Sequence, residues 1–300
     1  MIHFNCTKIL IPVDFSDTSM LAIKHGRALA QKTNAGIYLL HVVNVQFVSQ
    51  NMFLPSVSLD QSLIEKKAND RLTELANEIA KEYDILVQTI IKTGSPSTEV
   101  SKVAKEIGAS VIVMGTHGYS PLEELVIGST ALKVITKAHC PTMAMSSDAT
   151  QIGYKTVVLP IDNTVNSRQK VHFTLEFAKR FDATVYVVGL LSNDEADEKP
   201  AMELILHQIK VLAKEKNVKI ESEILSNVSN RANATVKFVE KVGGDVIVIM
   251  TDQDAELSGF FLGPYSQQVI HLSKVPVIAI KPLDLFVDEG GFPSTKTSGF

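Results

Sequence analysis

The residues best suited to chemistry lie where an apolar run, residues 111–114, is followed by two glycines. The run has the length and β-branched content of a buried strand, and Gly115 and Gly118 come directly after it. After nine further residues, residues 128–130 (Gly-Ser-Thr) begin an amphipathic helix. A glycine at a strand end lets a ligand lie against the backbone, and the N–H groups and dipole of a helix N-terminus attract anions. This spacing indicates a phosphate site.

A second polar group follows the first strand that the sequence predicts. Residues 8–13 are apolar and lead into Asp14, and Ser16 or Asp17 has the residue type of a helix cap. Strands alternating with helices indicate a parallel α/β sheet with helices on both faces. The other elements expected in this half are strands at 36–44, 85–92 and 141–146 and helices beginning near 58 and 96.

The pattern occurs again in the second half of the chain. Residues 155–162 resemble residues 8–14, and the two aspartates are 148 positions apart (162 − 14). Residues 246–249 resemble residues 111–114 at an offset of 135 (246 − 111). A repeat of this length predicts two similar domains. The expected boundaries are 1–148 and 149–284 for the domains and 285–300 for a tail.

Each half ends in a short apolar strand, at 141–146 and 276–281, that would be an exposed sheet edge. We expect these two edges to pair, so that the halves form a pseudo-dimer within one chain. A homodimer of whole chains is left open.

Composition excludes several classes of protein. The 300 residues are 45% hydrophobic and carry a net charge of −4 with no basic block, which argues against a nucleic-acid partner. Two cysteines, Cys6 and Cys140, form no Cys-x2-Cys pair, which argues against a disulfide scaffold or structural zinc. No stretch of 18 apolar residues and no leader pattern is present, so we expect a cytoplasmic protein with no membrane association.

The spacing Gly-x2-Gly-x9-Gly-Ser, filled by Gly115, Gly118, Gly128 and Ser129, resembles the ATP-binding motif of the universal stress protein family. The resemblance covers both halves and is to the tandem, UspA-like type. It implies two open parallel five-stranded sheets with strand order 3-2-1-4-5, the adenine nucleotide α-hydrolase-like arrangement. In that order the ends of strands 1 and 4 face one crevice, which is where open α/β sheets bind ligands.

The resemblance also implies roles for single residues. Residues 12–14 would line the adenosine end, Val42 would meet adenine through its main chain, and the glycines with residues 129–130 would hold ribose and phosphates. Asp14 could instead only cap the following helix, and His117 could contact phosphate or only order its loop. The complete set of residues expected at the nucleotide is Pro12, Val13, Asp14, Val42, Met114, Gly115, His117, Gly118, Gly128, Ser129 and Thr130.

Three kinds of function remain open at this point. The first is an ATP-binding regulatory or stress-response factor, with Mg²⁺ bound through the phosphates as an open question. The second is a scaffold that needs no nucleotide, in which the glycines only shape turns. The third is an ATP-using enzyme such as an adenylating ligase, but residues 14–19 lack the glycines of such a loop. No catalytic residue or metal cluster is evident, so any ATP hydrolysis is expected to be slow.

The second half departs from the motif. At an offset of 135, Met250 takes the place of Gly115 and Gln253 that of Gly118. Pro264 replaces Ser129 and removes a backbone N–H, and Tyr265 replaces Thr130. We therefore expect nucleotide to bind in the first half only.

Overall fold

The computed structural model describes residues 2–44, 61–118, 127–192, 197–251 and 262–283, and the backbone of 286–287 and 293–294. The first half contains β1 (Lys8–Pro12), α1 (Asp17–Thr33), β2 (Gly36–Val43), α3 (Gln61–Tyr83), β3 (Val87–Thr93), α4 (Pro96–Ile107), β4 (Val111–Gly115), α5 (Ser129–Lys137) and β5 (Thr142–Met145). The second contains β6 (Thr156–Ile161), α6 (Val165–Arg168), α7 (Val171–Phe181), β7 (Thr184–Leu190), α8 (Lys199–Glu215), β8 (Lys219–Leu225), α9 (Arg231–Val242), β9 (Val246–Met250), α10 (Pro264–Leu272) and β10 (Val277–Ile280).

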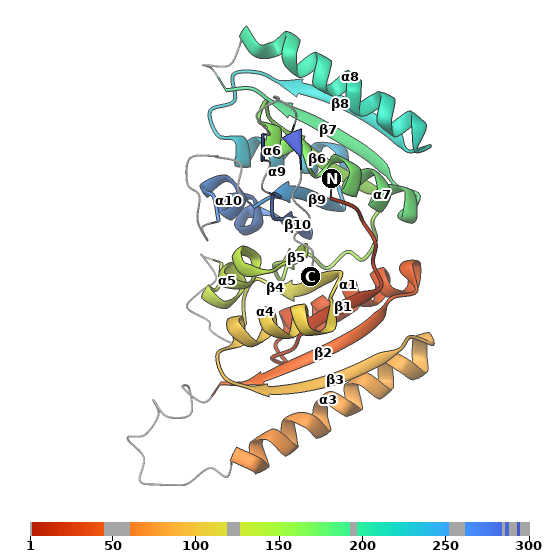
Figure 1. Ribbon diagram of the computed structural model, residues 1–300, viewed down its shortest axis with the longest axis vertical. Coiled ribbons are helices and arrows are strands. Elements are labelled where there is room, and N and C mark those ends of the chain that lie inside the picture. The colour runs from red at the N-terminus through yellow and green to blue at the C-terminus, as the bar shows by residue number, and fades with distance from the viewer. Residues whose placement is uncertain are drawn as a thin grey trace.

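All ten of these strands form one continuous sheet (Figure 1). Its order is β3-β2-β1-β4-β5-β10-β9-β6-β7-β8, so each half has the expected order 3-2-1-4-5. The halves join where β5 and β10 pair antiparallel, with Val277 opposite Ala144 and Ala279 opposite Thr142. The expected edge pairing is therefore confirmed, and it removes two apolar edges from exposure. This pairing joins the two expected five-stranded sheets into one.

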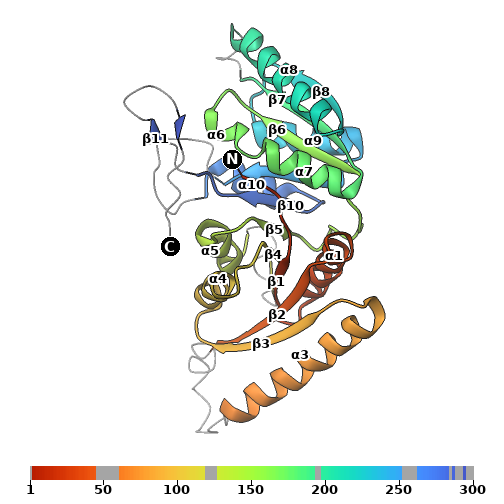
Figure 2. The same cartoon turned by 45° about the vertical axis from the view of Figure 1, so that its right-hand side comes forward.

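Helices cover both faces of the sheet (Figure 2). Side chains from α1, α3, α7 and α8 belong to one large buried cluster with the strand residues of that face. Side chains from α4, α5, α9 and α10 belong to a second cluster on the other face. Alternate strand residues enter alternate clusters, as in β1, where Ile9 and Ile11 join the first and Leu10 the second. No helix within the described ranges combines the length and apolar composition needed to cross a membrane.

The repeat is visible in the hydrogen bonds of the backbone. The Gly128 N–H donates to the Thr116 carbonyl at 2.9 Å, and 135 residues later the Gly263 N–H donates to the Thr251 carbonyl at 3.1 Å. Equivalent positions in the two halves can therefore be compared residue by residue at these ends of the sheet.

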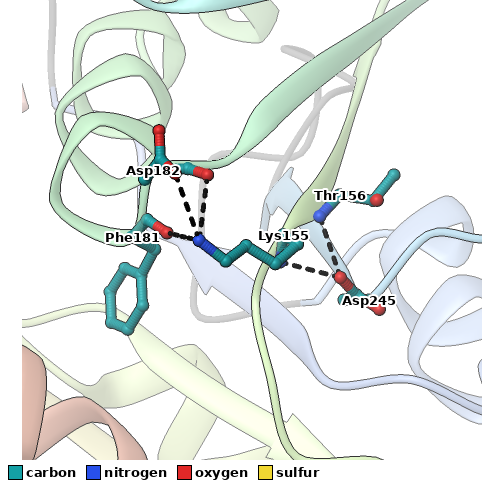
Figure 3. Close-up of polar contacts among 5 residues, drawn as sticks. All are labelled: Lys155, Thr156, Phe181, Asp182 and Asp245. Carbon is teal, nitrogen blue, oxygen red and sulfur yellow. Dashed lines mark hydrogen bonds and ion pairs between the residues drawn. The ribbon is translucent and has the colours of Figure 1, made fainter.

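Polar contacts fix the start of β6 in the second half (Figure 3). The Asp245 carboxylate accepts hydrogen bonds from the backbone N–H groups of Lys155 and Thr156, at 2.7 and 2.8 Å. The Lys155 ammonium donates to the carbonyl oxygens of Phe181 and Asp182, at 3.0 and 3.3 Å. These contacts join the carboxyl end of α7 to the amino ends of β6 and β9, which lie at the opposite end of the sheet from the carboxyl ends of the two strands.

Two short strands occur near the carboxyl end of the chain, β11 (Phe286–Val287) and β12 (Pro293–Ser294), and they pair with each other in a two-stranded sheet of their own. That residues 285–300 form a tail outside the fold stays a prediction. Just before them, the Gln169 side-chain amide exchanges hydrogen bonds with the backbone of Leu283, at 2.8 and 3.1 Å. The expected start of α3 at Ser58 lies outside the described residues.

Candidate functional site

A cavity of about 380 Å³ opens at the carboxyl ends of β1, β2 and β4. All eleven residues that the sequence predicted for a nucleotide site line it, so the structure brings the two separated groups together. The lining residues that were not predicted are Ser19, Leu40, Pro96, Val100, Thr116 and Ala131. Pro96 and Val100 are one turn apart at the start of α4 and therefore lie on the same face of that helix. This spacing is the signal in the sequence that could have marked both as lining residues.

The first turn of α1 holds the Asp14 side chain in place. Asp14 Oδ1 accepts hydrogen bonds from the Ser16 N–H at 3.0 Å and from the Ser16 hydroxyl at 2.5 Å. The Ser16 hydroxyl in turn accepts from the Ser19 N–H at 3.3 Å and caps the helix. One carboxylate oxygen of Asp14 therefore serves the helix cap, while the residue also lines the cavity.

Gly115 and Gly118 are needed for a reason that the sequence did not reveal. A Cβ atom on Gly118 would lie 2.6 Å from Asp14 Oδ2, and a Cβ atom on Gly115 would lie 2.8 Å from the Thr18 Cβ. The Thr18 hydroxyl also donates to the His117 carbonyl at 2.5 Å. The two glycines thus let the first turn of α1 pack against the loop after β4, whatever else they do.

Val42 lines the cavity near the end of β2, and its main chain is available there. The Val13 N–H donates to the Leu40 carbonyl at 2.8 Å, and the Gly94 N–H donates to the Val43 carbonyl at 3.0 Å. Successive residues of a parallel strand direct their N–H and C=O groups to opposite neighbouring strands. Leu40 bonds to the β1 side and Val43 to the β3 side, so the N–H and C=O of Val42 point to the β1 side, beyond the last residue of β1. A donor and an acceptor side by side match N1 and the 6-amino group of adenine.

The opposite end of the cavity is suited to negative charge. Gly128 is the N-cap of α5, and the first turn of that helix contains no acidic residue. Ser129 is exposed and Thr130 half-buried in that turn, and both line the cavity. The N–H groups and dipole of this helix end favour an anion such as phosphate.

His117 has an ordering role in this structure. Its Nδ1 lies 2.9 Å from the Thr116 hydroxyl, and its carbonyl accepts the hydrogen bond from Thr18. The Thr116 N–H donates to the Met145 carbonyl at 2.8 Å, which ties this loop to β5. His117 nevertheless lines the cavity, so contact with a bound phosphate remains compatible with its position.

The possible metal ligands and the two cysteines were compared with what metal or thiol chemistry would require. Within the described parts of the chain, no group of three or more histidine, cysteine, aspartate or glutamate side chains could hold a metal ion. A Mg²⁺ ion that arrived with a nucleotide would find the phosphates, its own waters and the Ser129 hydroxyl, which fits the way this ion usually binds. Burial raises the pKa of Cys6 to about 11 and that of Cys140 to about 12, so both thiols stay protonated and unreactive.

The equivalent crevice of the second half is built differently. Met250, in the place of Gly115, is fully buried, and Pro264 begins α10 at the first helical position. Asp162, the equivalent of Asp14, is buried and accepts hydrogen bonds from the Thr164 N–H at 2.9 Å and hydroxyl at 2.6 Å. Gln253, expected in the place of Gly118, lies outside the described residues. The hydrogen bonds that hold the aspartate are thus retained in the second half, while the residues around the N-terminus of α10 differ from those around α5.

An open α/β sheet whose crevice lies between the first and fourth strands, with a glycine loop and a helix N-terminus at one end, defines a class of ligand-binding proteins. The sequence model of the Universal stress protein family matches residues 5–145 and again residues 153–281. The chain belongs to the universal stress protein family, as a tandem member.

Individual relatives agree with this assignment. Universal stress protein MJ0531 of Methanocaldococcus jannaschii is 35% identical over 141 residues, which are 46% of this chain and 81% of that protein. Universal stress protein YxiE of Bacillus subtilis is 33% identical over 142 residues, 45% of this chain and 96% of that protein. A crystal structure of a universal stress protein from Archaeoglobus fulgidus matches with a TM-score of 0.73 at 20% identity, over 93% of this chain and 98% of that chain. This last likeness concerns the fold alone.

Proposed function

We propose that the first half of this protein binds an adenine nucleotide, ATP in the first place, and that the protein acts as a regulatory or stress-response factor. One observation supports the proposal: the same cavity is lined by Val42 and by the N-terminal residues of α5. These are the groups that a base and a phosphate chain require. The eleven lining residues that the sequence predicted are proposed as the nucleotide site.

The proposal includes the division of the chain. Residues 1–148 would form the domain with the intact site, residues 149–284 a domain that does not bind nucleotide, and residues 285–300 a tail. Asp14 is the one carboxylate among the described lining residues, and its Oδ1 accepts hydrogen bonds from Ser16, so we expect any hydrolysis to be slow. A cytoplasmic location stays a prediction from the sequence.

The chain itself suggests the variant that tests the proposal. Pro264 shows that proline fits the first position of the helix in the second half, so Ser129→Pro should fold normally. It removes one N–H and one hydroxyl from the phosphate end, which we expect to weaken ATP binding by about 10–100-fold. The matched control is Pro264→Ser, which should leave ATP binding unchanged. Calorimetric titration of the two variants and the wild type measures this directly.

A scaffold without nucleotide is the second candidate, because the packing of α1 against the loop explains Gly115 and Gly118 without any ligand. Mass spectrometry of small molecules released from protein purified without added nucleotide separates the two candidates. Retained adenine nucleotide supports the first. A ligand-free protein with no measurable affinity for ATP, ADP or AMP supports the scaffold.

A further inference from the structure

Tyr265, in the first turn of α10, contacts the neighbouring helix α9. Its hydroxyl lies 3.0 Å from the Thr235 hydroxyl. At the offset of 135, Tyr265 takes the position of Thr130 and Thr235 that of Val100, and both of these line the cavity of the first half. The hydroxyl contact therefore joins the counterparts of two residues that line the first cavity.

Tyr265 is half-buried as a residue and packs against the buried cluster of the face that carries α9 and α10. Burial of the hydroxyl raises the pKa of Tyr265, against the effect of the hydrogen bond with Thr235, and the Asp162 carboxylate raises the pKa further. Asp162 is the equivalent of Asp14. The same buried cluster contains Leu190, which is the equivalent of Val42.

A second buried polar group distinguishes this half from the first. The Lys170 side chain is fully buried and donates hydrogen bonds to the Ser167 carbonyl at 2.7 Å and hydroxyl at 3.2 Å. The Ser167 hydroxyl also accepts from the Asp162 N–H at 3.1 Å. At the offset of 148, Lys170 takes the position of Ala22, so the first half has no equivalent lysine. Burial lowers the pKa of Lys170 to about 7, against the effect of the Asp162 carboxylate.

We propose that the second crevice is a binding site for a phenol ring and that Tyr265 is its permanently attached ligand. The hydroxyl is recognised by Thr235, and the ring fills the space that the first half leaves for a nucleotide. This half is then held in a ligand-occupied form without any small molecule. The proposal does not depend on nucleotide binding by the first half.

Chemical rescue tests this proposal in the full chain. Tyr265→Ala should leave an aromatic-sized cavity and lower the thermal midpoint by about 10 °C. Saturating p-cresol, a free analogue of the whole tyrosine side chain that exceeds the removed phenol ring by one methyl group, should restore about half of that loss in the variant and leave the wild type unchanged. Toluene, which lacks the hydroxyl, should restore less. In Tyr265→Ala with Thr235→Val, p-cresol should lose its advantage over toluene.

A second variant covers the case in which Tyr265→Ala does not fold. Tyr265→Phe keeps the ring and should lower the midpoint by about 2–4 °C through loss of the hydroxyl contact, whereas Thr130→Ala in the first half should not lower it. The proposal is overturned if Tyr265→Phe has the wild-type midpoint. It is also overturned if p-cresol stabilises the wild type as much as Tyr265→Ala, or if Tyr265→Ala binds one more ATP than the wild type, since the residue would then only gate a nucleotide site.

Discussion

The contact between Gly118 and Asp14 can be tested as an energetic coupling. An added Cβ on Gly118 would lie 2.6 Å from Asp14 Oδ2, well inside the distance at which carbon and oxygen repel. In Gly118→Ala the carboxylate must therefore move away. Asp14 Oδ1 would then lose one or both of its hydrogen bonds from Ser16. Asp14 is exposed, so water replaces part of what its carboxylate loses, and we expect a loss of about 1 kcal/mol in the free energy of unfolding.

A double-mutant cycle isolates this contact. Asp14→Ala removes the carboxylate, so adding Gly118→Ala in that background should cost almost nothing. Urea unfolding of the wild type, the two single variants and the double variant should give a coupling free energy of about 1 kcal/mol, since residues in direct contact couple on that scale. If the two substitutions are additive within about 0.3 kcal/mol, the glycine does not serve the aspartate and the steric argument fails.

Two further predictions concern stability against pH. Burial alone would raise the pKa of Glu176, but hydrogen bonds from His3 and Lys216 lower it to about 2. Because the folded pKa lies below the unfolded value near 4.5, the stabilisation is present above pH 4.5 and is lost as the pH falls toward 2. Glu176→Gln should cost on the order of 2–3 kcal/mol at pH 7 and show a flatter decline in acid, as measured by urea unfolding across pH. Burial lowers the pKa of His25, whose Nδ1 lies 2.7 Å from the Tyr154 hydroxyl. The stabilisation from the neutral His25 is therefore present above pH 6.5 and is lost as the pH falls below that value. His25→Phe should remove this decline in urea unfolding, and an unchanged profile would count against a neutral, buried imidazole.

Local signals in the sequence predicted most of the site. Glycine spacing after an apolar run placed Gly115, Gly118 and the start of α5, because turns and helix starts depend on residues close together in the chain. The pairing of β5 with β10 followed from two apolar strands that would otherwise be exposed. The strand order came from the resemblance to the family, and the structure confirms it.

What the sequence could not predict depends on packing between distant segments. The approach of Asp14 to Gly118 joins residues 104 positions apart (118 − 14), and no periodicity signals it. The sequence indicated that Tyr265 replaces a small residue of the phosphate end, but not that its hydroxyl contacts Thr235. The direction of a side chain is set by its neighbours in the fold, so this contact became visible only in the structure.

The central claim is that one chain binds one adenine nucleotide, in its first half. Native mass spectrometry of the full chain titrated with ATP tests it most directly, because it counts bound molecules per chain. We expect a single ATP on the wild type and on Pro264→Ser, and a strongly reduced bound fraction on Ser129→Pro at the same concentrations. Two equivalent ATP molecules per chain, or full binding by Ser129→Pro, would contradict the account.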